Sequence, residues 1–492
     1  MIKRLIIKNF KSIKELNIEL EQINAFIGPN NSGKSNIIQA LNLILGETYP
    51  TVRAFNEKDF HNYDKSRPIK IDVRFDQPLT TDSRVWGFSL SYDGNTCEYV
   101  TLDQNGNLLT WTDKFGRTRE IHVSSLMKNE VLLMYLGLDR QAYQQMKPTQ
   151  WTVYGKLLTH IEKTINLANK EKFKSDVESA YEANIASYLK TVITTTKEFI
   201  KKQTGLDLDF RLSTIDPIET LKNLRPYFRV PDTTLEFDAE DVGAGVQSAL
   251  AIAIARTYAH VVKQPLALAI EEPELYLHPH ACRYFYKLLF ELAGDGIQVF
   301  YTTHERSFVD LMNYQNIHLV RMALGETYVT SGNSFSLSLN ETTRIASKFD
   351  DTLNEVFFAN RVVLTEGATD KIAARCALEK LGVNLDKENI SVVECGSADA
   401  IYDIARILKN FHVSCYVLID EDPGNMKTQK LIEDLKSLLG NKNVLLQSPN
   451  LEGLLDLPHK PSKKEALEIF PKWFRDRSPP EVYHGLKEQM GV

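Results

Sequence analysis

The chain has 492 residues, of which 43% are hydrophobic and 25% are charged, and its formal net charge is −6. A chain of this length exceeds what one hydrophobic core usually serves, so two or three domains are expected. No apolar run approaches the roughly 18 to 20 residues that cross a bilayer. The negative charge argues against binding nucleic acid through a global positive field, although a local basic face or bound metal ions would still allow it.

The N-terminus and the cysteines predict a cytoplasmic protein. Lys3, Lys8 and Lys11 interrupt alternating apolar residues, which is typical of a strand and not of a signal peptide. The five cysteines are widely separated and include no C-x-x-C pair that would seed a zinc site or a redox couple. We therefore expect the cysteines to be reduced and the protein to be soluble.

The first 150 residues predict strands followed by a glycine-rich loop and a helix. Strands are expected over Ile2–Ile7, Ile13–Leu20 and Ile23–Ile27, and the helix over Lys34–Leu45. The alternating segments "IKIDVRFD" and "FSLSYD" come next. They predict an antiparallel β-meander.

Residues 151–225 change to a helical pattern. Segments such as "SAYEANIASYLKTVITTTKEFIKK" have apolar residues at helical spacing and many Lys and Glu residues. We interpret this region as a helical insertion that mediates contacts in a dimer or higher oligomer, with clamping of DNA as the alternative.

An α/β pattern returns over residues 226–348 and again over 349–492. Buried strands such as "PLALAI" and "IQVFYTTH" alternate with helices in the first region, and "RVVLTEG", "ISVVECG" and "CYVLIDED" do so in the second. Such alternation predicts mostly parallel sheets covered on both faces. The fold class is therefore α/β, with the second of these regions forming a separate Rossmann-like unit.

The stretch "IGPNNSGKSN" fits the motif G-x-x-x-x-G-K-[ST] at Gly28, Gly33, Lys34 and Ser35, directly after an apolar strand and before a helix. Glycine lets the loop wrap with its N–H groups pointing inward, so that Lys34 reaches the outer phosphates and the Ser35 hydroxyl binds Mg²⁺. The predicted nucleotide-binding residues here are Gly28, Pro29, Asn30, Asn31, Ser32, Gly33, Lys34, Ser35 and Asn36.

Two acids end the apolar strand "PLALAI". Glu271 is predicted to hold the Mg²⁺ of the nucleotide and Glu272 to activate water, because adjacent carboxylates are costly to bury without a metal or partner. A solvated strand end is the alternative. His304, after the strand "QVFYTT", is placed to sense the terminal phosphate, although a lone histidine is often structural.

Over about residues 1–345, this combination resembles the ABC-type ATPases of the SMC and OLD kind. The stretch "VGAGVQSALAIAIA" is similar to a divergent form of their signature segment, with Gly243, Gly245 and Gln247 replacing the usual glycine-rich core. The resemblance implies that ATP is the nucleotide. It also implies that Gly243 and Gly245 close over nucleotide held by another subunit in a head-to-head homodimer, whereas a plain helix start is the alternative for these glycines.

Four further acids lie at the ends of C-terminal strands. Glu366 and Asp370 occur in "VVLTEGATDK", and Asp420 and Asp422 in "CYVLIDEDPGN", where strand alternation predicts that the last two face the same side. Such acids would repel one another unless they bind a divalent cation, and oxygen ligands favour Mg²⁺ or Mn²⁺. Loop caps and solvated turns are the alternative.

The pattern E-G-x-x-D followed by D-x-D resembles the Toprim domain, over about residues 358–460. The resemblance implies two metal ions, with Glu366 and Asp370 in one ligand set and Asp420 and Asp422 in the other, and cleavage of a phosphodiester. Glu452 matches an additional glutamate of OLD-type domains and would complete the metal shell. A basic residue is also expected downstream, among Lys460, Lys463 and Lys464.

An ABC-type ATPase joined to a Toprim domain resembles the OLD (overcoming lysogenization defect) family, as in Gabija-type defence nucleases. The implied domains are an ATPase in two parts (1–150 and 226–348), the insertion (151–225), and a Toprim domain with a C-terminal extension (349–492). The resemblance implies an ATP-regulated, metal-dependent DNA endonuclease in bacterial anti-phage defence, acting with DNA and in some members with a partner protein.

Two rival functions remain open. One is a nucleotide-switched sensor or scaffold whose Toprim domain binds nucleic acid or a partner without cutting. The other is a topoisomerase or primase, although the sequence shows no convincing tyrosine nucleophile motif or zinc-binding primase module.

Overall fold

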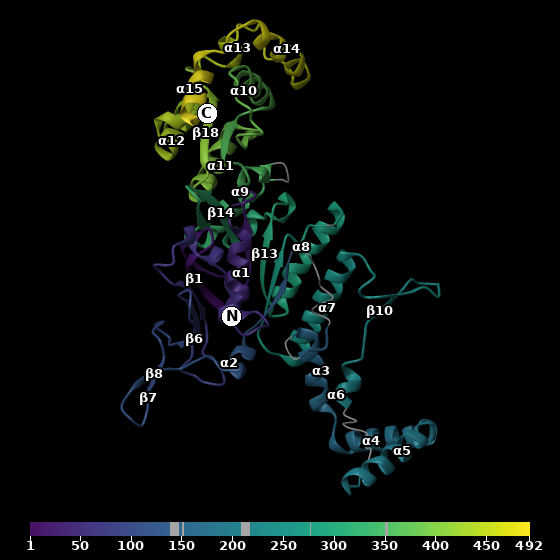
Figure 1. Cartoon of the computed structure of the whole chain (residues 1–492). Coiled ribbons are helices and arrows are strands. Elements are labelled where there is room, and N and C mark those ends of the chain that lie inside the picture. The colour runs from purple at the N-terminus through teal and green to yellow at the C-terminus, as the bar shows by residue number, and fades with distance from the viewer. Residues whose placement is uncertain (138–146, 150–151, 208–216, 276, 350–352) are drawn as a thin grey trace. The chain divides into compact units, whose positions relative to one another are not determined.

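The computed structural model describes residues 1–137, 147–149, 152–207, 217–275, 277–349 and 353–492 (Figure 1). The chain forms two compact units, one of Met1–Tyr135 with Ala267–Val492 and one of Leu136–Leu266. The first unit thus joins segments from both ends of the sequence. In the part of the chain that the structure describes, no helix is both long and apolar enough to cross a membrane.

The β-meander predicted from the sequence is present as a five-stranded antiparallel sheet of order β2-β1-β4-β5-β6. Alternating apolar residues bury one face of its strands; in β1, for example, Leu5 and Ile7 are fully buried while Lys3 and Lys8 are exposed. The bounds are β1 (Ile2–Phe10), β2 (Ile13–Glu19), β4 (Ile69–Phe75), β5 (Gly87–Tyr92) and β6 (Cys97–Leu102). A hairpin of β7 (Thr110–Thr112) and β8 (Thr118–Glu120) and the helix α2 (Ser125–Glu130) follow.

The second sheet of this unit has the order β15-β14-β3-β13-β12-β9. Strands β12, β13, β3 and β14 run parallel, as predicted, and β15 is antiparallel to β14. The helix α1 contacts β13 of this sheet and β1, β4 and β5 of the meander, so it packs between the two sheets. The bounds are β3 (Ile23–Ile27), α1 (Lys34–Leu45), β9 (Leu132–Leu136), β12 (Leu266–Glu271), α8 (Pro279–Gly294), β13 (Gln298–Thr303), β14 (Ile317–Ala323) and β15 (Glu326–Ser331).

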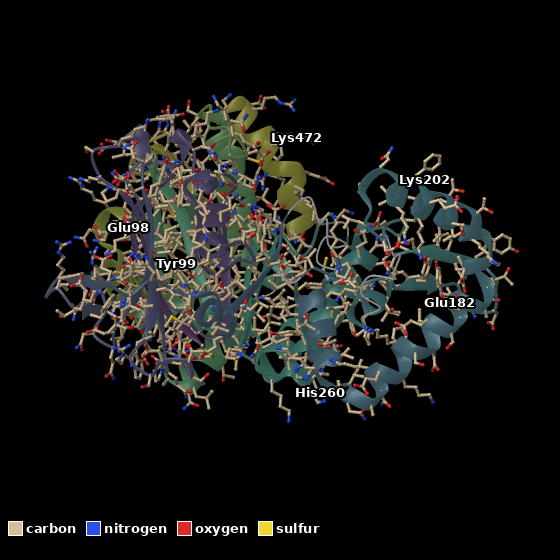
Figure 2. All side chains as sticks on the ribbon, turned by 60° about the horizontal axis from the view of Figure 1, so that its bottom comes forward. Glu98, Tyr99, Glu182, Lys202, His260 and Lys472 are labelled. Carbon is tan, nitrogen blue, oxygen red and sulfur yellow. The ribbon has the colours of Figure 1, made fainter. Side chains whose placement is uncertain are left out.

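The second unit is mainly helical and contains the helices that the spacing of apolar residues predicts. Helices α4 and α5 contact each other and bury none of their side chains; Figure 2 labels Glu182 on α4 and Lys202 on α5. Helix α3 packs on α6 and α7. The bounds are α3 (Val153–Thr164), α4 (Leu167–Asn184), α5 (Ala186–Thr204), α6 (Pro217–Leu221), β10 (Tyr227–Arg229), β11 (Glu236–Asp238) and α7 (Ala244–Val262).

The C-terminal region contains a four-stranded parallel sheet of order β17-β16-β18-β19. Because the strands are parallel, their carboxyl ends meet at one edge, where ligands of such sheets usually bind. The strands are β16 (Arg361–Thr365), β17 (Ile390–Glu394), β18 (Ser414–Asp420) and β19 (Val444–Gln447). The helices are α9 (Leu339–Ala346), α10 (Ala368–Lys380), α11 (Ala398–Asn410), α12 (Met426–Leu439), α13 (Leu451–Leu454), α14 (Lys463–Asp476) and α15 (Glu481–Met490).

The C-terminal extension forms part of the core of this parallel sheet. Phe470 and Phe474 of α14 and Tyr483 of α15 are at most 2% exposed and join the cluster around Val363 of β16. Its aromatic residues therefore pack on the sheet. The sequence alone left open whether they pack there or contact DNA.

Candidate active sites

The nucleotide-binding loop between β3 and α1 has a backbone that only glycine adopts readily at two positions. Gly28 and Gly33 have φ angles of 145° and 100°. A Cβ atom on Gly28 would lie 2.0 Å from the carbonyl oxygen of Val320, and one on Gly33 would lie 2.1 Å from Thr327 Oγ1. The glycines of the motif are therefore needed both for φ and for space.

Lys34 is the buried cation of this loop. It is 5% exposed, and its ammonium donates hydrogen bonds to the carbonyl oxygens of Gly28 (3.0 Å) and Pro29 (2.8 Å). Burial lowers the pKa of Lys34 to about 8, while the charges of Glu272 and Glu274 act in the opposite direction. Phosphate oxygens would supply stronger acceptors for this ammonium than the loop carbonyls do.

The acids after β12 gather beside this lysine. Glu272 Oε1 lies 3.2 Å from His304 Nε2, so the structure brings together two residues that the sequence predicted separately. Burial, followed by the nearby charge of Lys34, lowers the pKa of His304, and Glu272 opposes that shift. Glu271, at the end of β12, is buried and accepts a hydrogen bond from the Tyr135 hydroxyl at 2.6 Å.

Glu274 belongs to the same group but was missed in the sequence. Its Oε1 accepts hydrogen bonds from Thr303 Oγ1 and from the backbone N–H of His304, both at 2.8 Å, whereas its buried Oε2 has no partner among the described residues. Burial raises the pKa of this carboxyl. The only signal for it was a third acid in "EEPE" after the strand.

The signature-like glycines lie in the second unit. Gly243 precedes α7 with an extended backbone (φ −60°), and Gly245 lies in the first turn of the helix. The predicted helix N-terminus is present, but the contact of these glycines with nucleotide on another subunit stays a prediction.

Glu366, Asp370 and Asp420 lie at the carboxyl edge of the parallel sheet. Glu366 follows β16, and Asp370 lies in the first turn of α10 and is 3% exposed. Asp420 ends the neighbouring strand β18, is 8% exposed, and accepts a hydrogen bond from the N–H of Leu451 at 2.9 Å. The parallel pairing of β16 with β18 brings these acids to one place.

Gln447 links the two aspartates and was not predicted. It ends β19 and is fully buried. With its amide oxygen accepting from the Tyr483 hydroxyl at 3.1 Å, its nitrogen donates to Asp370 Oδ1 at 2.9 Å and to Asp420 Oδ1 at 3.1 Å. One amide group therefore contacts both carboxylates. The available signal was its place at the end of an apolar strand, in register with Asp420.

The electrostatics join these aspartates to further charged residues. Burial raises the pKa of Asp370 to about 6; Lys460 opposes this shift, and Glu366 and Glu452 add to it. Burial, and then the charge of Asp370, raises the pKa of Asp420 to about 7. We call Glu366, Asp370, Asp420 and Glu452 the acidic cluster.

Lys460 and Glu452 complete the surroundings of the acidic cluster. Burial acts to lower the pKa of Lys460, but the four acids of the cluster together raise it above its ordinary value. The other two lysines predicted as candidates, Lys463 and Lys464, begin α14 and are exposed. Glu452 Oε1 is buried and has no hydrogen-bond partner among the residues that the structure describes.

Asp422 is not joined to the acidic cluster by the contacts of the described residues. Strand β18 ends at Asp420, and Asp422 has a left-handed backbone (φ 42°) with its N–H donating to the carbonyl of Pro449 at 2.9 Å. Strand alternation therefore stops two residues before Asp422, and the placement of Asp422 in the metal site stays a prediction.

The acidic cluster has the chemistry of a site for a hard divalent cation. It offers only carboxylate oxygens, and its buried Glu452 oxygen lacks a donor, so a cation would satisfy an atom that otherwise carries a desolvation cost. Within the described residues, no three His, Cys, Asp or Glu side chains already stand close enough to hold an ion. The cluster thus fits Mg²⁺ or Mn²⁺ in its donors, and bound metal stays a prediction.

Comparison with known proteins matches both halves of this description. Residues 23–310 match the AAA-domain family whose description names the AbiEii toxin of the type IV TA system, and residues 357–422 match the Toprim domain of proteins like the overcoming lysogenization defect protein. Among solved structures, an Smc head domain from Pyrococcus furiosus is 17% identical and aligns over 70% of this chain and 98% of its own, with a TM-score of 0.42. The class of protein is an ATPase fused to a Toprim domain.

Two relatives span nearly the whole chain. The OLD nuclease of Thermus scotoductus is 30% identical, over 94% of this chain and 93% of its own length. The endonuclease GajA of Bacillus cereus is 22% identical, over 99% of this chain and 85% of its own. The chain therefore belongs to the OLD nuclease family, as its motifs predicted, and its AAA domain implies ATP as the nucleotide.

Proposed function

We propose that this OLD-family nuclease is a DNA endonuclease that depends on a divalent metal ion and is controlled by ATP. The observation that carries the proposal is the contact of Asp370 and Asp420 with one buried amide, that of Gln447, at the carboxyl edge of the parallel sheet. Two buried carboxylates held this close repel each other when ionised. That cost is more readily explained by a cation-binding role than by folding alone.

The residues of the cluster suggest how each would act. Glu366, Asp370, Asp420 and Glu452 would hold the ions, and Asp422 stays a predicted ligand. When bound, Mg²⁺ or Mn²⁺ supplies a nucleophilic water and charge neutralisation for phosphodiester cleavage. Lys460 places an ammonium beside the acids, where it offsets part of their repulsion and can pair with a phosphate oxygen of the DNA.

At the other site, Lys34 and Ser35 would bind the phosphates and Mg²⁺ of ATP, together with Glu271. Glu272 lies against His304 and beside Lys34, which suits a base that orients water near the terminal phosphate. Hydrolysis or binding of ATP would then control the distant nuclease site.

We further propose a homodimer. Gly243 and Gly245 would contact ATP on the partner's ATPase head, and α5 offers a second contact. Tyr188, Val192 and Phe199 are 84%, 61% and 62% exposed and recur at helical spacing on α5. Exposed apolar stripes of this kind are typical of protein interfaces.

By relationship to GajA, a role in anti-phage defence in the bacterial cytoplasm, alone or with a partner protein, is part of the proposal.

The rival function is a nucleotide-switched sensor or scaffold that binds DNA or a partner without cutting it. A supercoiled plasmid incubated with Mg²⁺ or Mn²⁺ separates the two, because only a nuclease converts it to nicked or linear product. Products that are relaxed and resealed would instead indicate a topoisomerase. Glu366→Ala should remove cutting while Lys34-dependent ATP binding remains.

A further inference from the structure

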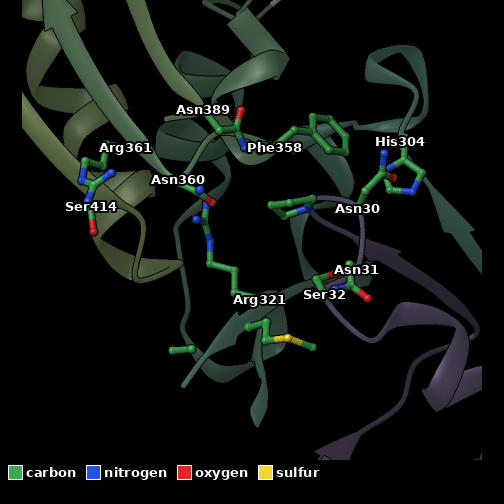
Figure 3. Close-up of a pocket in the computed structure, with 13 residues that line it drawn as sticks. Asn30, Asn31, Ser32, His304, Arg321, Phe358, Asn360, Arg361, Asn389 and Ser414 are labelled. Carbon is green, nitrogen blue, oxygen red and sulfur yellow. Dashed lines mark hydrogen bonds between the residues drawn. The ribbon is translucent and has the colours of Figure 1, made fainter. Parts of the chain in front are cut away.

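A cavity of about 970 Å³ lies between the nucleotide-binding loop and the amino-terminal edge of the parallel sheet (Figure 3). On one side it is lined by Asn30–Ser32 of the loop and by His304. On the other side Arg361 and Ser414, the first residues of β16 and β18, line it. It therefore faces the edge of the sheet opposite to the one that carries the acidic cluster.

The cavity is rich in positive charge. Arg321, near the end of β14, and Arg361 line it, and none of its described lining residues is Asp or Glu. Figure 3 shows the Arg321 side chain extending toward Asn360. Its Nη2 donates to the carbonyl oxygen of Ala359 at 2.8 Å, but its buried Nε has no partner among the described residues. Arg361 forms a long ion pair with an acid, its Nη1 lying 3.9 Å from Glu388 Oε2.

A guanidinium buried without a counter-charge is costly. Burial lowers the pKa of Arg321 to about 10, and no carboxylate among the described residues opposes that shift. An anion in the cavity would supply a compensating negative charge.

Other lining residues indicate more than an inorganic anion. Phe358 presents a partly exposed aromatic ring; Asn360 offers an amide group, and Asn389, whose Nδ2 donates to the Phe358 carbonyl at 2.9 Å, offers its amide oxygen. Aromatic rings and amides together are what a flat heterocyclic base requires for stacking and for hydrogen bonding. The volume is at the upper end of the range, roughly 300 to 1,000 Å³, of small-molecule sites.

We propose that this cavity is a second nucleotide site, in which Arg321 and Arg361 bind the phosphates and Phe358 stacks on the base. It shares Asn30–Ser32 and His304 with the loop site, but Lys34, the lysine of that site, does not line the cavity. Strand β16 runs from Arg361 at this site to the residue before Glu366. Its five residues cover roughly 16 Å, so a nucleotide bound here is remote from the acids and acts as a regulator. The proposal holds whether or not the acidic cluster cuts DNA.

Binding of ATP to the full-length chain tests this proposal by isothermal titration calorimetry. The phosphate-binding loop and the cavity are neighbours, so Lys34→Ala is used to remove the first site. We expect two ATP molecules per chain in the unmodified protein, one in Lys34→Ala, and binding at least tenfold weaker at the remaining site after Arg321→Met or Arg361→Gln is added. Arg117→Met, on an exposed turn of the β7–β8 hairpin, is the matched control and should leave binding unchanged.

Photolabelling makes the test independent of how the arginine variants fold. The Lys34→Ala chain is irradiated with 8-azidoadenosine triphosphate, and the labelled peptide is sequenced. Label on the peptide that contains Phe358 supports the second site. No ATP binding by Lys34→Ala, residual binding that is insensitive to both arginine changes, or absence of label from the Phe358 peptide would overturn it.

Discussion

At the scale of single residues, Lys34 makes the nucleotide site sensitive to pH. Burial lowers its pKa to about 8 in the free protein, and bound phosphate would keep it protonated. Above pH 8 binding must therefore take up a proton, so ATP affinity falls as pH rises, by about tenfold between pH 7 and pH 9. Equilibrium titrations at both values check this. Lys34→Arg stays charged and should show no such loss; an equal loss in that variant would assign the effect to another group.

Asp420 is predicted to cost stability in the absence of metal. The pKa of Asp420 is raised to about 7 in the folded protein, so folding favours the protonated carboxyl. The resulting contribution to the free energy of unfolding is fully present below pH 4 and is lost as pH rises toward 7. Asp420→Asn removes this cost and retains an oxygen for the Leu451 N–H. Without metal at pH 8 it should raise the free energy of unfolding by on the order of 1–2 kcal/mol. Thermal unfolding with and without Mg²⁺ should also show that the variant loses the stabilisation by metal. A variant that is destabilised, or that still responds to Mg²⁺ like the unmodified protein, would contradict this.

The residues that the sequence revealed are those whose pattern is local. Gly28, Lys34 and Ser35 form one contiguous motif, and Glu366 with Asp370 form another, so both sites could be predicted. Local patterns do not reveal Gln447 or Glu274, and they do not single out Lys460 among three lysines. Identifying these residues depends on knowing which strand ends and loops meet in space. The role of Asp422 stays a prediction for a related reason, because alternation holds only inside a strand and β18 ends at Asp420.

At the scale of elements, the C-terminal helix α15 supports the acidic cluster through Tyr483. Its hydroxyl donates to the Gln447 amide that contacts both aspartates. Tyr483→Phe should therefore lower the rate of plasmid nicking about tenfold, since the amide loses the partner that fixes it, and should leave ATP hydrolysis unchanged. Nicking rates at saturating Mg²⁺ measure the effect.

Tyr416, on β18 of the parallel sheet, offers a matched control for Tyr483→Phe. The Tyr416 hydroxyl donates to the carbonyl of Gln489 at 3.0 Å, and among the described residues it makes no hydrogen bond to the acids of the cluster. Tyr416→Phe removes a hydrogen bond of the same kind, so it should change stability similarly but not the nicking rate. Equal nicking losses in both variants would indicate a general loss of folding and not a role for α15 in positioning.

At the scale of the whole molecule, periodicity predicted the strands and helices. It could not predict that residues 1–135 and 267–492 join into one unit. Strand β3 pairs with β13 and β14, which lie nearly 300 residues away. No local pattern specifies such pairings. The family motifs supplied what periodicity lacked, because they associate the phosphate-binding loop with acids at distant strand ends.

The oligomer is also a property of the whole molecule. If the exposed stripe on α5 is an interface, charges placed on it should separate the subunits. Tyr188→Glu combined with Phe199→Glu should shift the sedimentation coefficient toward that of a monomer, because two carboxylates would be buried in an apolar contact. Thr194→Glu, on another face of the same helix, is the control and should leave the oligomer intact. An unchanged oligomer in the double variant would exclude α5 as the main contact.

The nuclease activity of the acidic cluster is tested most directly by plasmid nicking with purified full-length protein and Mg²⁺ or Mn²⁺, with and without ATP, beside Glu366→Ala. We predict metal-dependent nicking that EDTA abolishes and that Glu366→Ala reduces by at least a hundredfold, while ATP binding by the variant is retained. Nicking that is as fast in Glu366→Ala as in the unmodified chain, or no cutting by the unmodified chain under any of these conditions, would contradict the account.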